Sequence, residues 1–228
     1  MNKSVKKIGQ LGALAILSQI PVVAAFSKFF EDFVQDDWQE RIDLWKESVI
    51  QRLSLLDKEM EQKIRETSNF ASILATAQRG ALEDMEEDKV ALYVNAVVNS
   101  IKNEDIDDTK KHIFLNMLRN FTLLHIRILS FFSNIETNMK KRYPDTLFIR
   151  AQEAEEKWHE IVHLIMAQED KNICKNIVLY KKIYAELLRT DLLKGNNLSY
   201  SDGYSLIFPA KQTTILADEF LEFINEHK

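Results

Sequence analysis

Glycine and proline are scarce in this chain, whose 228 residues include only 5 Gly and 3 Pro. Tight turns and hairpins rely on these residue types, because glycine adopts positive φ readily and proline fixes φ. The scarcity therefore predicts long helices joined by few turns. With 46% hydrophobic residues, the chain can bury the core of one compact domain or of two small ones.

Apolar residues recur every three or four positions along much of the chain, which is the pattern of amphipathic helices. The clearest stripe covers 38–64 and suits either a core-facing helix or a dimer seam. Two more runs lie within 70–81 and 90–101. We expect a break between them at Gly80 and the acidic run 83–88, and we read the acidic run as a solvated turn or helix face.

The segment 113–132 is apolar nearly all round, so we expect it at the centre of its domain. Thr122 is placed to start a second helix within this segment. His125 is a single histidine in apolar surroundings, which favours a hydrogen-bonded core residue over a ligand.

The carboxy-terminal region combines helices with the one convincing strand signal. An amphipathic helix over 172–193 is predicted to stop near Gly195. Residues 198–208 contain Ser-Asp-Gly between two β-prone stretches, which predicts a short hairpin. A final helix follows, with Thr213 or Thr214 as its cap.

These patterns predict a mainly α fold: a multi-helix bundle with a small carboxy-terminal β-hairpin and a winged-helix-like end. We expect three regions along the chain. They are an apolar helical segment 1–35, a helical bundle 36–133, and a region 134–228 whose helices, hairpin and closing helix pack on the same core.

The first 35 residues begin with a basic stretch, after which Ile8–Ser27 carries no formal charge. Pro21 and several polar residues interrupt this run, so a membrane-spanning helix is marginal. A packed or membrane-surface helical segment is favoured, and a spanning segment and a signal peptide stay open. A membrane-associated effector acting through residues 8–30 is one functional alternative.

The stretch His-Glu-Ile-Val-His has the spacing that zinc metalloproteases carry on a helix. His159 and His163 would share the metal, and Glu160 would take a proton from the zinc-bound water. Catalytic zinc also needs a third protein ligand. The extended metzincin pattern fails at Met166 and Glu169, which leaves Glu186 as the nearby candidate.

Helical geometry puts this histidine pair on the flank of the helix, at the boundary with solvent, about 100–140° from the centre of the predicted apolar face. We therefore favour flank histidines and expect no cofactor, with a zinc-dependent hydrolase as the alternative. The single cysteine, Cys174, excludes an intrachain disulfide and a cysteine-based zinc site, which fits a reducing compartment.

The net charge of −5 and the pI near 5.6 argue against general coating of nucleic acid. A local basic patch is compatible with this balance. If the carboxy-terminal region is winged-helix-like and binds DNA, the candidate phosphate contacts are Lys175, Lys181, Lys182, Arg189 and Lys194.

The order of four stretches resembles the abortive-infection alpha type and related bacterial phage-defence proteins. The stretches are IPVVAAFSKFFEDF, LATAQRGALEDMEEDKVALYVNAVVNSI, FLNMLRNFTLLHIRILSFF and TTILADEFLEFINEH, and the likeness covers residues 20–133 and 210–227. The resemblance implies a bacterial, cytoplasmic, non-enzymatic defence or interaction protein with possible membrane association. It implies no catalytic residues.

The leading functional hypothesis is a non-enzymatic helical interaction or accessory protein, such as a subunit of an anti-phage defence assembly. It implies a protein partner or a homo-oligomer. It also implies a protein in the cytoplasm whose N-terminal segment can contact the membrane surface. The zinc hydrolase, the DNA-binding protein and the membrane effector are its alternatives.

Overall fold

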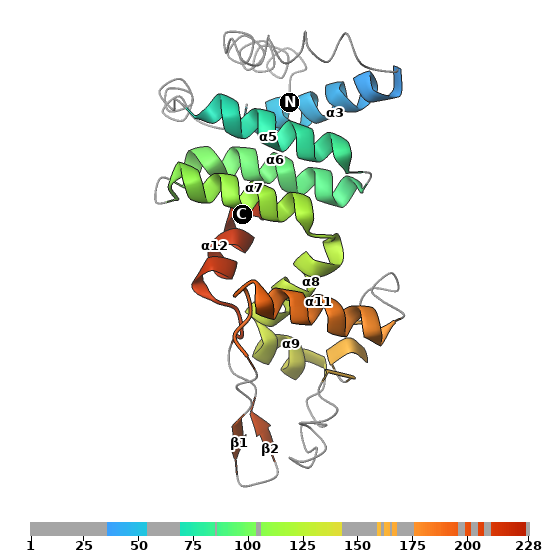
Figure 1. Cartoon of the computed structure of the whole chain (residues 1–228), viewed down its shortest axis with the longest axis vertical. Helices are drawn as coiled ribbons and strands as arrows, with labels where there is room; N and C mark the ends of the chain where they lie inside the picture. Colours follow the sequence, from blue (N-terminus) through green and yellow to red (C-terminus); the bar gives the residue numbers. More distant parts are fainter. Residues whose placement is uncertain are drawn as a thin grey trace, which may run out of the picture. The chain divides into compact units, whose positions relative to one another are not determined.

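The computed structural model describes residues 36–53, 69–84, 86–103, 106–142, 159–160, 162–164, 166–167, 176–195, 199–201, 205–207 and 211–226. Figure 1 shows the elements in sequence colours. The helices are α3 (Asp36–Leu53), α5 (Phe70–Glu83), α6 (Glu87–Lys102), α7 (Asp108–Asn120), α8 (Leu123–Ser133), α9 (Ile135–Arg142), α11 (Ile177–Arg189) and α12 (Ile215–Ile224). The strands are β1 (Ser199–Ser201) and β2 (Ser205–Ile207). The prediction of a mainly helical, multi-helix protein is confirmed.

The chain divides into two compact units. Unit 1 comprises residues 1–120 with 222–228, and unit 2 comprises residues 121–221. The boundary between the units, after residue 120, lies earlier in the chain than the boundary that we expected after residue 133. The helix breaks at this point, within the apolar run 113–132. Thr122 has an extended backbone and caps α8, and its backbone N–H and hydroxyl both lie within hydrogen-bond reach of His125 Nδ1. The expectation that Thr122 starts a second helix is confirmed.

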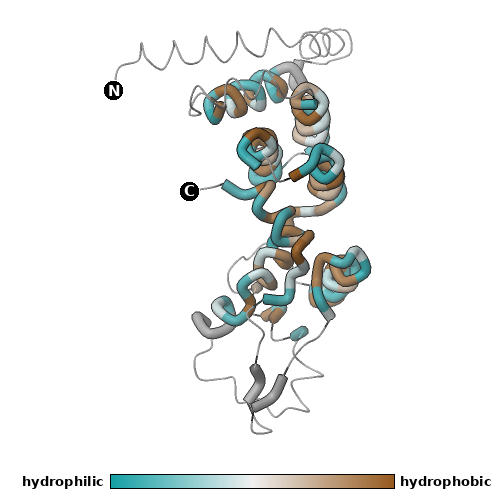
Figure 2. Tube along the Cα trace, turned by 90° about the vertical axis from the view of Figure 1, so that its left-hand side faces the viewer, coloured by the Kyte–Doolittle hydropathy of each residue, from teal (hydrophilic) through white to brown (hydrophobic). Residues whose placement is uncertain are grey.

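Unit 1 contains α3, α5, α6 and α7, with the predicted stripes facing inward. Figure 2 shows hydrophobic and hydrophilic residues alternating along these helices, as amphipathic helices require. Buried members of the core include Ile42, Trp45, Val49, Leu53, Phe70, Ile73, Ala77, Tyr93, Val97, Ile101, Phe114, Leu115 and Leu118.

Helices α5 and α6 approach each other closely at Gly80 of α5. A Cβ added to Gly80 would lie 2.5 Å from two ring carbons of Tyr93 and 2.6 Å from its hydroxyl oxygen. The ring of Tyr93, which is fully buried, therefore packs directly on the α5 backbone. The expected break does not fall at Gly80, because α5 continues through it to Glu83. It falls within the acidic run, between Glu83 and Glu87, as the other part of that expectation had it.

Part of the acidic run stabilises unit 1, whereas we expected it to be solvated. Lys89 is buried, and its Nζ lies 2.7 Å from the carboxylate of Asp84 and donates to the Arg119 carbonyl at 3.3 Å. Arg119 donates to both carboxylate oxygens of Glu83, at 2.7 and 2.8 Å. Residues 86–88 are exposed, as predicted. A buried lysine needs such a partner, because an unpaired ammonium in the core is strongly unfavourable.

Two asparagines of α6 bind the carboxy-terminal end of α12. The side-chain amide of Asn99 donates to the carbonyls of residues 222, 223 and 225 at 2.8–3.2 Å. The amide of Asn95 donates to the carbonyl of Ile224 at 3.1 Å and accepts from Arg52 at 2.7 Å. These contacts satisfy carbonyls that a helix end leaves without intrahelical donors. They attach residues 222–226 to unit 1.

Unit 2 contains α8, α9, the helical residues 159–160, 162–164 and 166–167, α11, both strands and the first part of α12. His125 is buried and stacks on Phe121, with ring centroids 5.1 Å apart. Its Nδ1 accepts from the Thr122 N–H, so the proton sits on Nε2, which lies 3.6 Å from Glu186. The expectation of a hydrogen-bonded core histidine is confirmed.

Helix α11 ends earlier than Gly195. Asp191 adopts φ 56°, the N–H of Leu192 donates to the carbonyl of Leu187, and the N–H of Asp191 donates to that of Leu188. This pair of bonds is the Schellman arrangement, with buried Leu192 as its apolar contact. Aspartate tolerates the left-handed region better than most residues, so no glycine is needed, and the predicted stop at Gly195 is corrected.

The chain after α11 forms an antiparallel pair. β1 pairs with β2 through Ser199–Ile207 and Ser201–Ser205, and a bridge joins Leu193 to Thr213. Five residues separate the two paired regions on each side, so the bridge and the strands share one register. Thr214 then caps α12, accepting from the N–H of Ala217 at 3.3 Å, as predicted.

Among the helices of the described ranges, none has both the length and the apolar character needed to cross a membrane. The segment 1–35, on which the membrane hypothesis rests, lies outside those ranges.

Replacement of Gly80 by Ala tests the contact with Tyr93. Glycine to alanine in a helix normally stabilises by roughly 0.5–1 kcal/mol, but here the new methyl overlaps the Tyr93 ring. We expect the free energy of unfolding to fall by about 1–3 kcal/mol. Thermal unfolding monitored by circular dichroism measures this change. Gly195→Ala is the control, because a Cβ there meets nothing within 4 Å. Unchanged or increased stability of G80A would contradict the contact.

Replacement of Asn99 by Ala tests the attachment of residues 222–226. Three carbonyls lose their donor, and we expect a destabilisation of about 1–3 kcal/mol. Hydrogen–deuterium exchange of the peptide covering 216–226 should accelerate. The matched control is Asn116→Ala, at an exposed position of α7. Equal exchange in both variants would show that Asn99 does not hold this segment.

Candidate functional site

The His-Glu-Ile-Val-His stretch is helical where it is described, but its histidines face inward. His163 is 9% exposed and His159 is half-buried, whereas Glu160 is exposed and Leu164 is 58% exposed. The expectation that both histidines lie at the boundary with solvent is therefore corrected. Val162 is buried as predicted. The other predicted members of the apolar face lie outside the described residues; they are Leu147, Ala151, Ala154, Trp158, Ile161 and Ile165.

The reason for this orientation is a cluster of rings with α11. The His159 ring lies edge-on to Tyr184, with centroids 4.7 Å apart, and 5.9 Å from Tyr180. The His163 ring lies 5.7 Å from that of Tyr180. Such tilted ring pairs contribute about 0.5–1.5 kcal/mol beyond the area they bury. The histidines thus belong to the packing between this helical stretch and α11.

Burial favours the neutral forms of His159, Tyr180 and Tyr184 in this cluster. Burial lowers the pKa of His159 from 6.5 to about 4, and the nearby Lys181 adds to the effect. Burial also raises the pKa of Tyr184 to about 12 and raises that of Tyr180. The phenols therefore stay protonated near neutral pH and supply no anionic ligand, whereas a neutral imidazole keeps the form that binds metals.

The structure does not bring the candidate third ligand to the histidine pair. Glu186 lies on the flank of α11, with its carboxylate 3.6 Å from His125 Nε2. Within the ranges given above, no group of three or more His, Cys, Asp or Glu side chains is placed to hold a metal. Cys174 is outside those ranges. Zinc binding by His159 and His163 stays a prediction for metal analysis.

The outer face of α11 is the second feature of unit 2. Asn176 begins the helix, its side-chain oxygen accepting from the N–H of Val178 at 2.9 Å. The inner face buries Tyr180, Ile183, Tyr184 and Leu187. On the opposite side, Val178, Lys182, Ala185 and Arg189 follow one another at helical spacing, all exposed.

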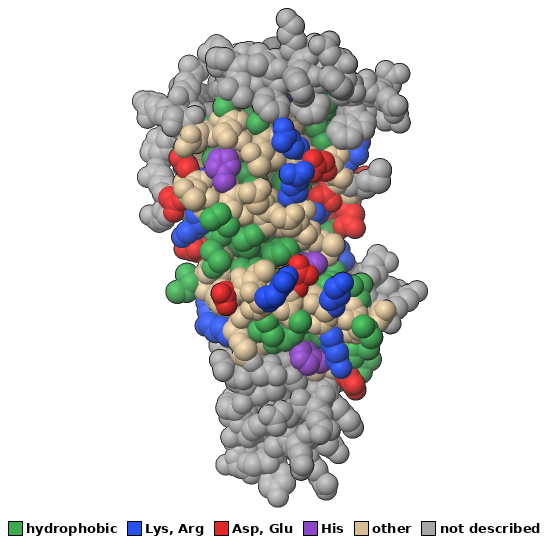
Figure 3. Space-filling model, viewed as in Figure 1, with side chains coloured by type: hydrophobic (Ala, Val, Ile, Leu, Met, Phe, Trp, Pro, Cys, Tyr) green, Lys and Arg blue, Asp and Glu red, His purple; other side chains and the backbone are tan. Residues whose placement is uncertain are grey.

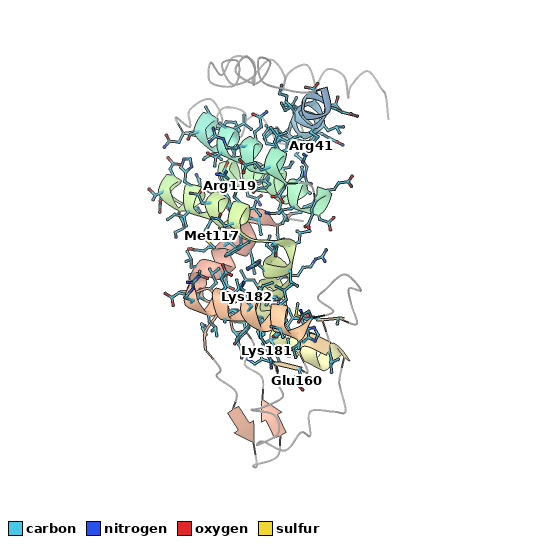
Figure 4. All side chains as sticks on the ribbon, turned by 45° about the vertical axis from the view of Figure 1, so that its right-hand side comes forward. Arg41, Met117, Arg119, Glu160, Lys181 and Lys182 are labelled. Atoms are coloured by element: carbon cyan, nitrogen blue, oxygen red, sulfur yellow. The ribbon has the colours of Figure 1, made fainter. Side chains whose placement is uncertain are left out.

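This outer face combines apolar and basic side chains. Val178 is 69% exposed and Leu179 is 45% exposed. Figure 3 shows hydrophobic side chains adjoining Lys and Arg side chains in this region, and Figure 4 shows Lys181 and Lys182 projecting from α11. The structure thus places three of the five basic candidates, Lys181, Lys182 and Arg189, on α11 and a fourth, Lys194, just after it, all exposed. The remaining one, Lys175, is not described.

Within the described residues, these four cations have no carboxylate partner in ion-pair range. The sequence revealed the cations, but the exposure of Val178 and Leu179 depends on which side of α11 the ring cluster occupies. We define Val178, Leu179, Lys181, Lys182 and Arg189 as the outer face of α11. At about 100° per residue, Val178, Lys182 and Arg189 lie along its centre, and Leu179 and Lys181 lie on its two flanks.

Unit 1 contains a groove that the sequence did not indicate. Helices α3, α5 and α6 enclose a volume of about 670 Å³. Its apolar wall is formed by Leu44, Trp45, Leu82, Val90, Ala91 and Val94. Leu44 is 57% exposed at its rim, although large apolar side chains on helices usually pack. Such a concave apolar surface is the usual form of a binding site.

Comparison with known proteins found no matching family model, curated protein or solved structure. The assignment of function therefore rests on the surfaces described above.

The pKa of His159 gives a direct test of the ring cluster. The pKa of His159 is lower in the folded chain than the value of 6.5 in the unfolded chain. As the pH falls, the unfolded state therefore takes up the proton before the folded state does. The stability contributed by the neutral ring is complete above pH 6.5 and falls between pH 6.5 and 4, by at most about 1.4 kcal/mol per pH unit.

Proton NMR titration of the imidazole signals should show one histidine that stays neutral to about pH 4. His159→Phe should remove that signal and should flatten the loss of stability below pH 6.5. His112→Gln, a change in unit 1, is the control. A His159 signal that titrates near its ordinary pKa would contradict the cluster.

Proposed function

We propose that this protein is a non-enzymatic interaction protein that docks a partner on the outer face of α11. The observation that carries the proposal is the exposure of Val178 and Leu179 beside Lys181, Lys182 and Arg189 on one helix. Exposed apolar side chains gathered on one surface and bordered by charged ones are characteristic of protein-binding sites. Their position on one rigid helix favours recognition of another helix or of an extended segment.

The chemistry of the face specifies the class of partner. Its three cations, Lys181, Lys182 and Arg189, have no carboxylate partner within the described residues and attract acidic groups, while Val178 and Leu179 provide apolar contact at the start of the helix. The partner that fits both is an amphipathic protein segment with acidic and apolar side chains. The inner face of α11 is held by Tyr180 and Tyr184, so the docking surface needs little ordering when the partner binds.

The proposed setting is a bacterial anti-phage defence assembly in which this chain is an accessory subunit. The support is the order of the four sequence stretches that resemble abortive-infection alpha proteins. The helical architecture is compatible with that resemblance. A cytoplasmic location, extending to the membrane surface through the N-terminal segment, belongs to the same proposal.

A second candidate function is binding of duplex DNA. The supporting observation is the antiparallel segment that follows α11 in one register, from the Leu193–Thr213 bridge to β1 and β2. A recognition helix followed by a β-hairpin is the arrangement of a winged helix, in which the helix enters the major groove. Lys181, Lys182 and Arg189 would then contact phosphates.

Fluorescence anisotropy with two defined probes separates these functions. One probe is a designed helical peptide with Glu and Leu on opposite faces, and the other is a random duplex of about two helical turns. For the peptide, we expect both Val178→Ser/Leu179→Ser and Lys181→Glu/Lys182→Glu to weaken binding at least about tenfold, equivalent to about 1.4 kcal/mol.

For DNA, only the charge reversal should matter, and the affinity should fall steeply with salt. Lys102→Glu, an exposed change on α6, is the control for net charge. Two outcomes would contradict a docking role for the outer face of α11. One is an unchanged affinity for the peptide in both double variants, and the other is that neither probe binds at low salt.

A further inference from the structure

We propose that the groove enclosed by α3, α5 and α6 is the docking site for the chain's own N-terminal apolar run, residues 8–27. This inference concerns unit 1 and is independent of the outer face of α11. It predicts an intramolecular contact that hides an apolar segment and closes an otherwise open apolar groove.

The first support is the character of the groove wall. Leu44 stands at the rim with 57% of its surface exposed, and Trp45, Leu82 and Val94 line the interior. Removing apolar surface from water contributes about 25 cal/mol per Å². A volume of about 670 Å³ accepts several side chains from one face of a helix. The favourable occupant is therefore apolar.

The second support is the charge balance of the lining. Two arginines, Arg41 and Arg52, and two acids, Asp84 and Glu87, border the groove. Arg41 donates to the backbone carbonyl of Asp84, and Arg52 donates to Asn95 and Glu226. The lining thus has no formal excess of either sign, and its arginines are already bonded within the unit. An acidic or basic peptide gains little there, whereas residues 8–27 carry no formal charge.

The third support is the position of the tether. Helix α3 begins at Asp36, and its first groove residue is Arg41, little more than one turn later. Eight residues, 28–35, join the apolar run to α3 and span at most roughly 26–29 Å when extended. A segment on such a short tether has an effective concentration in the millimolar range. Few external occupants reach that concentration in a cell.

The consequence for function is competition. Any membrane or partner that takes up residues 8–27 must first remove them from the groove, and any ligand of the groove must displace them. The two events are therefore linked with the same coupling free energy in both directions.

Photo-crosslinking in the full chain tests the contact. The photoreactive residue p-benzoyl-phenylalanine replaces Leu44 at the rim or Ser48, which is exposed on the same helix and also lines the groove. The control position is Ile113 of α7, which is 47% exposed and outside the lining. The protein is an equal mixture of unlabelled and ¹⁵N-labelled chains, and the linked peptides are identified by mass spectrometry.

The expected result is a link from position 44 or 48 to peptides within 8–27 of the same chain, and none from position 113. Mixed-isotope links would assign the groove to a second copy and overturn the proposal. Links to other peptides, to lipid or detergent, or no link at either groove position would also overturn it.

A variant measurement supplies an independent readout. Ala91→Arg puts a charge into the groove at an exposed position of α6, and Asn116→Arg puts the same charge on the exposed face of α7. We expect hydrogen exchange within peptides 8–27 to rise at least tenfold in A91R and to stay unchanged in N116R. Equal exchange in the two variants would contradict docking in the groove.

Discussion

The packing of Tyr93 on the backbone at Gly80 is the contact on which unit 1 depends. It sets the separation of α5 and α6, and those two helices border α3, α7 and the groove. The ring is fully buried, and burial raises the pKa of its phenol, so it stays neutral in this position. A larger residue at position 80 would move α6 outward and would change every surface that α6 helps to form.

Polar side chains provide the second level of organisation in unit 1. Lys89 and Asn99 are buried, and each bonds to elements distant in sequence. Buried polar groups stabilise only the arrangement that satisfies them, because an unpaired donor or charge in the core is strongly unfavourable. They therefore select one packing of the helices from the many that apolar stripes alone would allow.

Helix positions and their apolar faces were predictable from the sequence, because periodicity reports local exposure directly. The stripes on α3, α5 and α6 are buried as expected, and Thr122 and Thr214 cap the helices that follow them. Features that depend on distant partners were not predictable. The inward rotation of His159 and His163 depends on tyrosines that lie on α11, and the groove depends on the angle at which α3 meets α6.

The roles of Gly80 and Asn99 illustrate the same limit. A glycine within a helix and an asparagine in an apolar helix are ambiguous in one sequence, since both often mark helix ends. Their functions become clear only when the facing element is known. For the candidate site, the sequence identifies the basic residues directly. It does not identify Val178 and Leu179 as part of the site, because their exposure depends on which side of α11 is packed.

The binding of residues 222–226 by Asn95 and Asn99 also sets the order of events during synthesis. Unit 1 is discontinuous, because unit 2, residues 121–221, is inserted between its two parts. A ribosome adds roughly 5–20 residues per second, so helices α3 to α7 wait on the order of 5–20 s for the segment that completes their unit. During that interval the carbonyl-binding amides of α6 and the apolar faces around them are open to chaperones, and unit 2 is free to fold first.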